Sequence, residues 1–201
     1  MPGIRAQLLI GIIALSSLSA CVPLVVGTAA TGATVLHDRR TAGTMLDDQR
    51  IKISILNKVA EDERFKDSNI NVTSYNNNVL LTGEVPTKEV GLAAASIARD
   101  VEKVRQVHNE LVIAKPSLLR ARSNDSLITA SVKSALLAID LPGFDPTRVK
   151  VVTERKAVYL LGLVTSEEAH TTSERARRVS GVEKVIRLFE IVPPRPADTE
   201  A

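Results

Sequence analysis

An internal repeat is the feature of this sequence that most restricts its fold. Residues 46–192 match themselves when the chain is shifted by about 78 positions, and the matched segments keep the same order. The matching pairs are 48–55 with 125–132, 70–72 with 149–151, 79–83 with 158–162, and 101–107 with 179–185. The chain therefore contains two copies of one folding unit.

Both copies have the same predicted order of elements. An amphipathic helix is followed by two strands joined by a short turn, then by a second helix and a final strand. The turn in the first copy is Tyr75-Asn76-Asn77-Asn78, where Asn tolerates the positive backbone angles of tight hairpins, and the second copy uses Glu154-Arg155-Lys156. We predict an α+β fold of two tandem αββαβ sandwiches, each with two helices on one face of a small mixed three-stranded sheet.

Polar residues mark the expected starts of the helices. Asp48 and Asp125 occupy equivalent positions and are expected to cap the first helix of each copy. Thr87 and Ser166 are each followed two residues later by Glu, so we expect them to open the second helices. Negative charge in the first turn of a helix offsets the partial positive charge of its free amides.

The N-terminal segment has the organisation of an export signal. Arg5 precedes an apolar run over residues 8–18, which is too short to span a bilayer permanently. Leu18-Ser19-Ala20-Cys21 resembles the bacterial lipobox, in which the thiol receives a diacylglyceryl group and becomes the first residue of the mature chain. We expect lipidation at Cys21, the chain's only cysteine. The alternative is a plain signal peptide with a coincidental cysteine.

Lipidation also determines the expected location and boundaries. Several acyl chains anchor a protein stably where one does not. Val22 follows the cysteine in place of Asp, which resembles the pattern sent to the outer membrane, so we expect a periplasm-facing outer-membrane protein. The expected segments are a signal peptide over 1–20, a lipidated N-terminus and tether over 21–45, the first copy over 46–114, a linker over 115–123, the second copy over 124–192 and a disordered tail over 193–201.

Composition excludes several classes of function. The 26 basic and 23 acidic residues are nearly balanced, and only 2 Tyr, 3 Phe and no Trp are present, so nothing indicates a nucleic-acid partner. His37, His108 and His170 do not stand at metal-ligand spacing. Because no nucleophile motif or phosphate loop appears either, we expect no enzyme activity, metal or cofactor.

The repeated unit resembles the BON domain. The resemblance rests on the apolar second strand ending in Gly83 or Gly162 and on the spaced valines before the last strand of each copy. Two such copies behind a lipobox resemble dual BON-domain outer-membrane lipoproteins of the division- and stress-associated lipid-binding kind. The resemblance implies a non-enzymatic periplasmic module that associates with anionic phospholipids, such as phosphatidylglycerol, and supports outer-membrane integrity and septal cell-wall processing.

The first helix of the second copy carries the candidate lipid-binding residues. At about 100° per residue, Ile128, Val132 and Leu136 share the face expected to meet the core. The opposite side is small and uncharged apart from one lysine, and consists of Leu127, Ala130, Lys133, Ser134 and Leu137. Such a face suits either insertion among lipid headgroups or packing against the first copy, and the sequence leaves both open.

The resemblance favours the membrane, because its members place the start of this helix against phospholipid. Family members often have Trp where this chain has Leu127, which buries in acyl chains but lacks the amphipathic ring. Lys115, Arg120 and Arg122 in the expected linker would attract anionic headgroups if they lie at the surface. The alternative function is a protein-interaction adaptor for envelope or cell-wall-remodelling factors, with the lipid anchor as its sole membrane contact.

Overall fold

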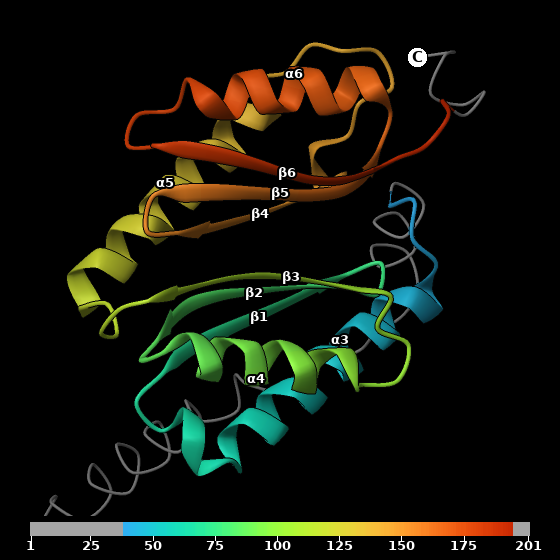
Figure 1. The fold of residues 1–201 in the computed structure, drawn as a ribbon. Coiled ribbons are helices and arrows are strands. Elements are labelled where there is room, and N and C mark those ends of the chain that lie inside the picture. Colours follow the sequence, from blue (N-terminus) through green and yellow to red (C-terminus); the bar gives the residue numbers. More distant parts are fainter. Residues whose placement is uncertain (1–37, 195–201) are drawn as a thin grey trace, which may run out of the picture. The chain divides into compact units, whose positions relative to one another are not determined.

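The computed structural model describes residues 38–194, which contain both copies of the repeat (Figure 1). The elements of the first copy are α3 (Ala42–Ala60), the short 3₁₀ turn η1 (Glu63–Phe65), β1 (Asn69–Tyr75), β2 (Asn78–Val85), α4 (Lys88–Arg99) and β3 (Gln106–Ile113). Those of the second are α5 (Leu119–Leu137), η2 (Pro146–Arg148), β4 (Val149–Glu154), β5 (Ala157–Val164), α6 (Ser166–Arg177) and β6 (Lys184–Ile191). The predicted αββαβ order is confirmed, while the signal peptide and Cys21 lie outside the described residues.

Each copy forms one mixed three-stranded sheet. In the first, β2 is central and pairs antiparallel with β1 and parallel with β3. The second repeats this arrangement, with β5 between β4 and β6. Figure 1 shows α3 and α4 on one side of the first sheet, and α5 and α6 on one side of the second. The predicted sandwich of two helices on a mixed sheet is therefore confirmed for both copies.

The cores between helices and sheets are aliphatic, as the scarcity of aromatic residues predicts. In the second copy, the expected helix stripe of Ile128, Val132 and Leu136 is buried against β4 and β5. Ile51 and Ile55 of α3 occupy the equivalent places in the first copy. Small alanines on α4 let that helix approach its sheet closely, namely Ala94, Ala95 and Ala98.

The repeated aspartates hold hairpin turns and do not cap helices. Asp48 lies inside α3, where its carboxylate accepts hydrogen bonds from the amides of Asn76 and Asn77, both at 2.8 Å. Asp125 inside α5 accepts the amides of Arg155 and Lys156, both at 2.9 Å. The expectation of helix capping is wrong because each carboxylate faces the turn that joins the first two strands.

These bonds explain how side chains other than glycine tolerate the turn. Asn76 and Asn77 have φ of 50° and 64°, and Arg155 and Lys156 have 50° and 62°. Two successive positive φ angles define the tight hairpin turn that matches the twist of antiparallel strands. Arg and Lys disfavour this conformation. The Asp125 carboxylate therefore stabilises a turn that the residue types at positions 155 and 156 do not favour.

The glycine that the two copies share in the second strand is required by close packing of the chain. A Cβ added to Gly83, whose φ is +114°, would lie 1.9 Å from the carbonyl oxygen of Asn69. At Gly162 it would lie 2.8 Å from the carbonyl oxygen of Arg148. No larger residue fits either place without moving the neighbouring backbone.

The starts of three helices differ from expectation. Helix α6 is capped by Thr165, whose hydroxyl accepts the amide of Glu168, so Ser166 is the first helical residue and not the cap. Thr87 caps α4 as predicted. Helix α3 begins at Ala42, inside the expected tether, and α5 begins at Leu119, inside the expected linker. No capping side chain marks the start of α5, because its N-cap residue is Leu118, which forms no side-chain hydrogen bond.

Replacing Asp125 by Ala should destabilise the second copy by about 3 kcal/mol, because two amides lose hydrogen bonds to a charged acceptor. Asp125→Asn retains one acceptor oxygen, so its free energy of unfolding should lie between those of the parent chain and Asp125→Ala. Urea unfolding of the chain from residue 22 onward measures the difference. The control is Asn124→Ala at the exposed neighbouring position of α5. Equal stability of the Asp125→Ala and Asn124→Ala variants would contradict the role given to this carboxylate.

Candidate functional site

The two copies contact each other through the sheet faces that the helices leave uncovered. Side chains alternate along a strand, so Leu80 and Leu161 point away from the helices of their own copies. They form one buried cluster with Tyr75 and Tyr159. Leu80 is fully buried and Leu161 is 1% exposed, although both lie outside the helix-covered cores. The first and second copies therefore share a third hydrophobic core.

Amide and carboxylate side chains surround this shared core. Asn71 donates to Glu154 at 2.9 Å, and Asn76 and Asn78 both donate to one oxygen of Glu190 at 2.7 Å. The first copy supplies the amides and the second supplies the carboxylates. Charge-assisted hydrogen bonds of this kind are stronger than neutral ones and fix the register of the two surfaces.

The two tyrosines of the shared core also bond across it. The Tyr75 hydroxyl donates to the carbonyl oxygen of Arg148 at 3.0 Å, and the Tyr159 hydroxyl reaches a carboxylate oxygen of Glu110 at 3.5 Å. Burial, followed by the charge of Asp38, raises the pKa of Tyr75 to about 12. Its hydroxyl therefore stays protonated and remains a donor at neutral pH.

Glu154 is a buried carboxylate in this contact. It is 8% exposed, and burial is the main cause that raises its pKa above the usual value. The hydrogen bond from Asn71 opposes the shift, while the charges of Glu84 and Asp125 add to it. Holding a charged Glu154 in the domain contact at neutral pH therefore costs free energy.

A second buried carboxylate connects the start of the described chain to the second copy. Glu168, 4% exposed, pairs with Arg39 at 2.5 Å and with Arg148 at 3.1 Å. Arg39 also donates to the carbonyl oxygen of Leu163 at 2.9 Å. Arg39, inside the expected tether of residues 21–45, is therefore bound to the second copy.

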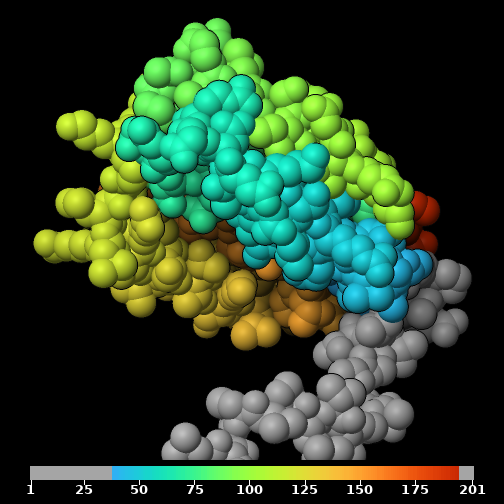
Figure 2. Space-filling view, turned by 90° about the horizontal axis from the view of Figure 1, so that it is seen from below, coloured from blue at the N-terminus to red at the C-terminus, as the bar shows by residue number. Residues whose placement is uncertain are grey.

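The predicted lipid-binding face of α5 lies at the surface. Leu127 and Leu137 are 68% and 73% exposed. All five predicted residues, which we call the outer face of α5, are exposed: Leu127, Ala130, Lys133, Ser134 and Leu137. In Figure 2 the yellow segment, which comprises α5 and the residues before it, presents side chains that project from the surface. A helix face with two exposed leucines is unusual for a solvated surface.

The domain contact does not use this face. The shared core consists of strand residues, whereas the outer face of α5 points away from its own sheet, which packs against Ile128 and Val132. The alternative in which Leu127 and Leu137 pack against the first copy is therefore wrong. The sequence could not distinguish the two because it did not show which surface joins the copies.

The early start of α5 adds apolar surface from residues that were expected to form a linker. Leu118 and Leu119 are each 79% exposed, at the N-cap and first residue of the helix. At about 100° per residue, Leu119 falls on the same side as Leu137, and Arg120 falls close to Leu127. The adjacent pair Leu118-Leu119 was the available sequence signal, since two leucines are rare in a solvated linker.

The charged side chains that α5 exposes are all basic. They are Arg120, Arg122 and Lys133, while the helix's one acidic residue, Asp125, is buried against its turn. The hydroxyl of Ser123, one helical turn before Leu127, donates to the carbonyl oxygen of Leu119 at 3.0 Å. A hydroxyl that already donates a hydrogen bond to its own helix costs less free energy to move out of water than a hydroxyl without such a bond. The helix thus combines apolar and cationic groups, the pattern of helices that lie at membrane interfaces.

The first copy does not repeat this surface. With Asp48 and Asp125 aligned, Arg50 replaces Leu127 and Ala60 replaces Leu137. Arg50 forms an exposed ion pair with Asp47 at 3.4 Å. The first copy therefore lacks both leucines of this face, although it has the apolar Ile53 in place of Ala130.

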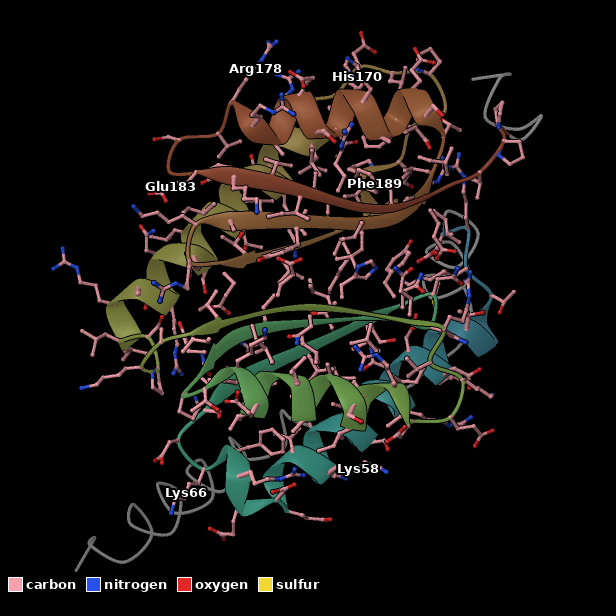
Figure 3. The ribbon with its side chains drawn as sticks, in the orientation of Figure 1. Lys58, Lys66, His170, Arg178, Glu183 and Phe189 are labelled. Carbon is pink, nitrogen blue, oxygen red and sulfur yellow. The ribbon has the colours of Figure 1, made fainter. Side chains whose placement is uncertain are left out.

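The described residues lack the features of a metal site and of a membrane-spanning helix. Between residues 38 and 194, no three His, Cys, Asp or Glu side chains are grouped to hold a metal ion. His170 lies on the outer side of α6 (Figure 3), and the pKa of His108 is lowered mainly by burial. No helix in this range has the length and apolarity needed to cross a bilayer.

Comparison with known proteins identifies the repeated unit. The family model for the BON domain matches residues 47–115 and 124–193. The chain is 38% identical over 174 residues to the Outer membrane lipoprotein DolP of Haemophilus influenzae, covering 86% of this chain and 89% of that protein. It is 36% identical over 156 residues to a 21 kDa hemolysin of Actinobacillus pleuropneumoniae, covering 77% and 79%. The Osmotically-inducible protein Y of Escherichia coli is 30% identical over 147 residues, covering 71% and 72%.

The chain belongs to the BON-domain family, with two such domains in tandem. We refer to the first and second copies from here on as BON1 and BON2. The resemblance inferred from the repeat and the strand glycines is thereby confirmed.

Replacing Glu168 by Ala should destabilise BON2 by about 3–5 kcal/mol, because Arg39 and Arg148 would lose their shared buried carboxylate. Thermal unfolding and urea unfolding both measure this loss. Glu167→Ala is the matched control, since that glutamate is the exposed neighbour in the same helix turn. A loss of less than about 1 kcal/mol in Glu168→Ala would show that the two arginines find other partners.

Glu154→Gln should remove a pH-dependent loss of stability. Because the pKa of Glu154 is raised in the folded chain, the folded state binds its proton more tightly than the unfolded state. The free energy of unfolding therefore falls as pH rises through the window between the ordinary and the raised pKa, and stays lower above it.

The variant keeps an acceptor for Asn71, so it should be more stable than the parent at pH 7 and equally stable near pH 4. Urea unfolding at both pH values tests this, with Glu102→Gln at an exposed position of BON1 as control. A difference between variant and parent that is independent of pH would contradict the assignment.

Proposed function

We propose that this protein is a periplasm-facing outer-membrane lipoprotein, anchored through Cys21, whose BON2 domain binds anionic phospholipid through the outer face of α5. The single observation that carries the lipid-binding role is the exposure of Leu127 and Leu137 on a helix whose exposed charges are all basic. The anchor and the location are supported by the lipobox-like sequence before Cys21 and by the similarity to an outer membrane lipoprotein.

The two interactions of this helix with a membrane have comparable sizes. Burying a leucine side chain fully is worth about 1.5–3 kcal/mol. Each basic residue held near an anionic surface adds about 1 kcal/mol. Two leucines with Arg120, Arg122 and Lys133 therefore suffice for a peripheral contact, which the lipid anchor strengthens by keeping BON2 near the bilayer.

The geometry of this contact and the names of the relatives support a role in the envelope. A module that holds lipid headgroups would organise the inner leaflet of the outer membrane, to which the anchor would attach it. We propose that BON2 supports outer-membrane integrity and septal envelope processes through this lipid contact. This role needs no catalysis and no cofactor. The relatives named an outer membrane lipoprotein and an osmotically-inducible protein are consistent with an envelope role.

The adaptor function remains the second candidate, in a different form from the one that the sequence suggested. Leu46 and Ile53 are 59% and 55% exposed on α3 of BON1, one helical heptad apart. This small apolar stripe would suit an envelope or cell-wall-remodelling protein. It lies on the other domain, so binding to such a partner and binding to lipid through α5 need not compete.

Liposome co-sedimentation of residues 22–201, which lack the lipid but include every described residue, tests the lipid-binding role. Leu127→Asp and Leu137→Asp should each weaken binding to vesicles containing phosphatidylglycerol by tenfold or more, because each removes apolar burial and adds repulsion. Leu92→Asp is the matched control, since Leu92 is 53% exposed on α4 of BON1. Absence of binding by the parent chain, or equal loss in all three variants, would contradict the proposal and favour the adaptor.

A further inference from the structure

A pocket at the meeting point of both BON domains has a lining without acidic residues. It has a volume of about 380 Å³ and is bounded by the residues before α3, the β1–β2 hairpin, α5 and β4. Its charged lining residues are Arg40, Lys133 and Lys150. Pockets of a few hundred cubic ångströms with a mixed polar and apolar lining are typical of small-molecule sites.

One of these cations is neutralised inside the protein. The guanidinium of Arg40 lies over the ring of Tyr75 at 3.9 Å and forms ion pairs with Asp38 at 2.8 Å and Asp48 at 2.9 Å. Arg40 therefore forms a wall of the pocket and leaves little net charge there.

The two lysines are not neutralised. Among residues 38–194, neither Lys133 nor Lys150 has a carboxylate within ion-pair distance. Burial lowers the pKa of Lys150, and the charges of Lys133, Lys52 and Arg40 lower it further. Like charges that gather without counter-charge repel one another, and a bound anion would remove that repulsion.

The surroundings of the pocket indicate where the anion comes from. Leu137, one of the exposed leucines of the outer face of α5, also lines the pocket, together with Leu136. Lys133 belongs to both surfaces. An anion bound here would thus lie beside the surface that we propose to meet acyl chains, which is the place of a lipid phosphate.

We propose that Lys133 and Lys150 form a headgroup site in this pocket for the phosphate of an anionic phospholipid. This inference rests on the lipid-binding role proposed for the outer face of α5. It adds a residue on β4, Lys150, and a wall from BON1, Tyr75, to a contact otherwise confined to one helix. Because both domains line the pocket, lipid binding would stabilise the contact between BON1 and BON2.

Lys150→Glu separates the site from the helix face, because Lys150 lies outside α5. Binding to phosphatidylglycerol vesicles should weaken by about thirtyfold, since the reversal changes two charges at the surface. Lys150→Arg should retain the binding. Thermal stability without lipid should not fall in Lys150→Glu, because the change relieves repulsion among cations. The matched control is Lys184→Glu, an equal charge reversal at an exposed lysine of BON2, which should change the binding less than threefold.

Equal weakening by Lys150→Glu and Lys184→Glu would overturn the site and leave only a diffuse charge effect. A second measurement does not need vesicles: titration of residues 22–201 with glycerol 3-phosphate, followed by the amide NMR signals of β4 and of Tyr75. Saturable shifts that Lys150→Glu abolishes would support the site even if the outer face of α5 failed to bind vesicles. The absence of such shifts would overturn it.

The same probe distinguishes lipid from free phosphate. If inorganic phosphate binds more tightly than phosphatidylglycerol vesicles do, the pocket is a site for a soluble anion and the lipid assignment is wrong. If vesicles bind and the Leu127→Asp variant loses that binding while Lys150→Glu does not, the proposed function stands and this inference fails.

Discussion

The contact between the uncovered faces of the two sheets is the interaction on which the rest of this structure depends. A three-stranded sheet with two helices on one side leaves its other face apolar, and neither BON domain has an element of its own to cover it. Leu80 and Tyr75 from BON1 pack against Leu161 and Tyr159 from BON2, so each sheet covers the apolar face of the other. Because the sheets are used in this way, the helices of both domains face outward, and the outer face of α5 remains available to a ligand.

Duplication supplied two copies of one scaffold whose surfaces then diverged. The parts that build the fold are repeated closely: Asp48 and Asp125 each hold a hairpin turn through two backbone amides. The outer helix face is not repeated, since Arg50 stands where BON2 has Leu127. The two domains thus keep the same aspartate-bound hairpin turn, while their outer helix faces differ and can contact different partners.

The sequence predicted the fold well because the repeat gave each element twice. It failed where one side chain serves a distant segment: the pattern around Asp125 suggests a helix cap, but the carboxylate bonds to the amides of Arg155 and Lys156, about thirty residues away. The outer face of α5 could be predicted from helical periodicity alone. Lys150 could not, because its proximity to Lys133 depends on how β4 lies beside α5.

Salt should act differently on the two kinds of polar contact in this protein. The domain contact has an apolar core, and around it Asn71, Asn76 and Asn78 donate partly buried hydrogen bonds to two glutamates. Two ion pairs also cross the contact, Arg105–Glu190 at 3.0 Å and Arg155–Glu84 at 3.4 Å. The side chains of Lys133 and Lys150 are solvent-exposed, although the amino group of Lys150 is partly desolvated. Their attraction for anions is therefore screened over a Debye length of about 8 Å at physiological ionic strength. Ionic strength should therefore weaken the proposed attraction of BON2 for an anionic surface more than it weakens the contact between domains, because that contact also has an apolar core.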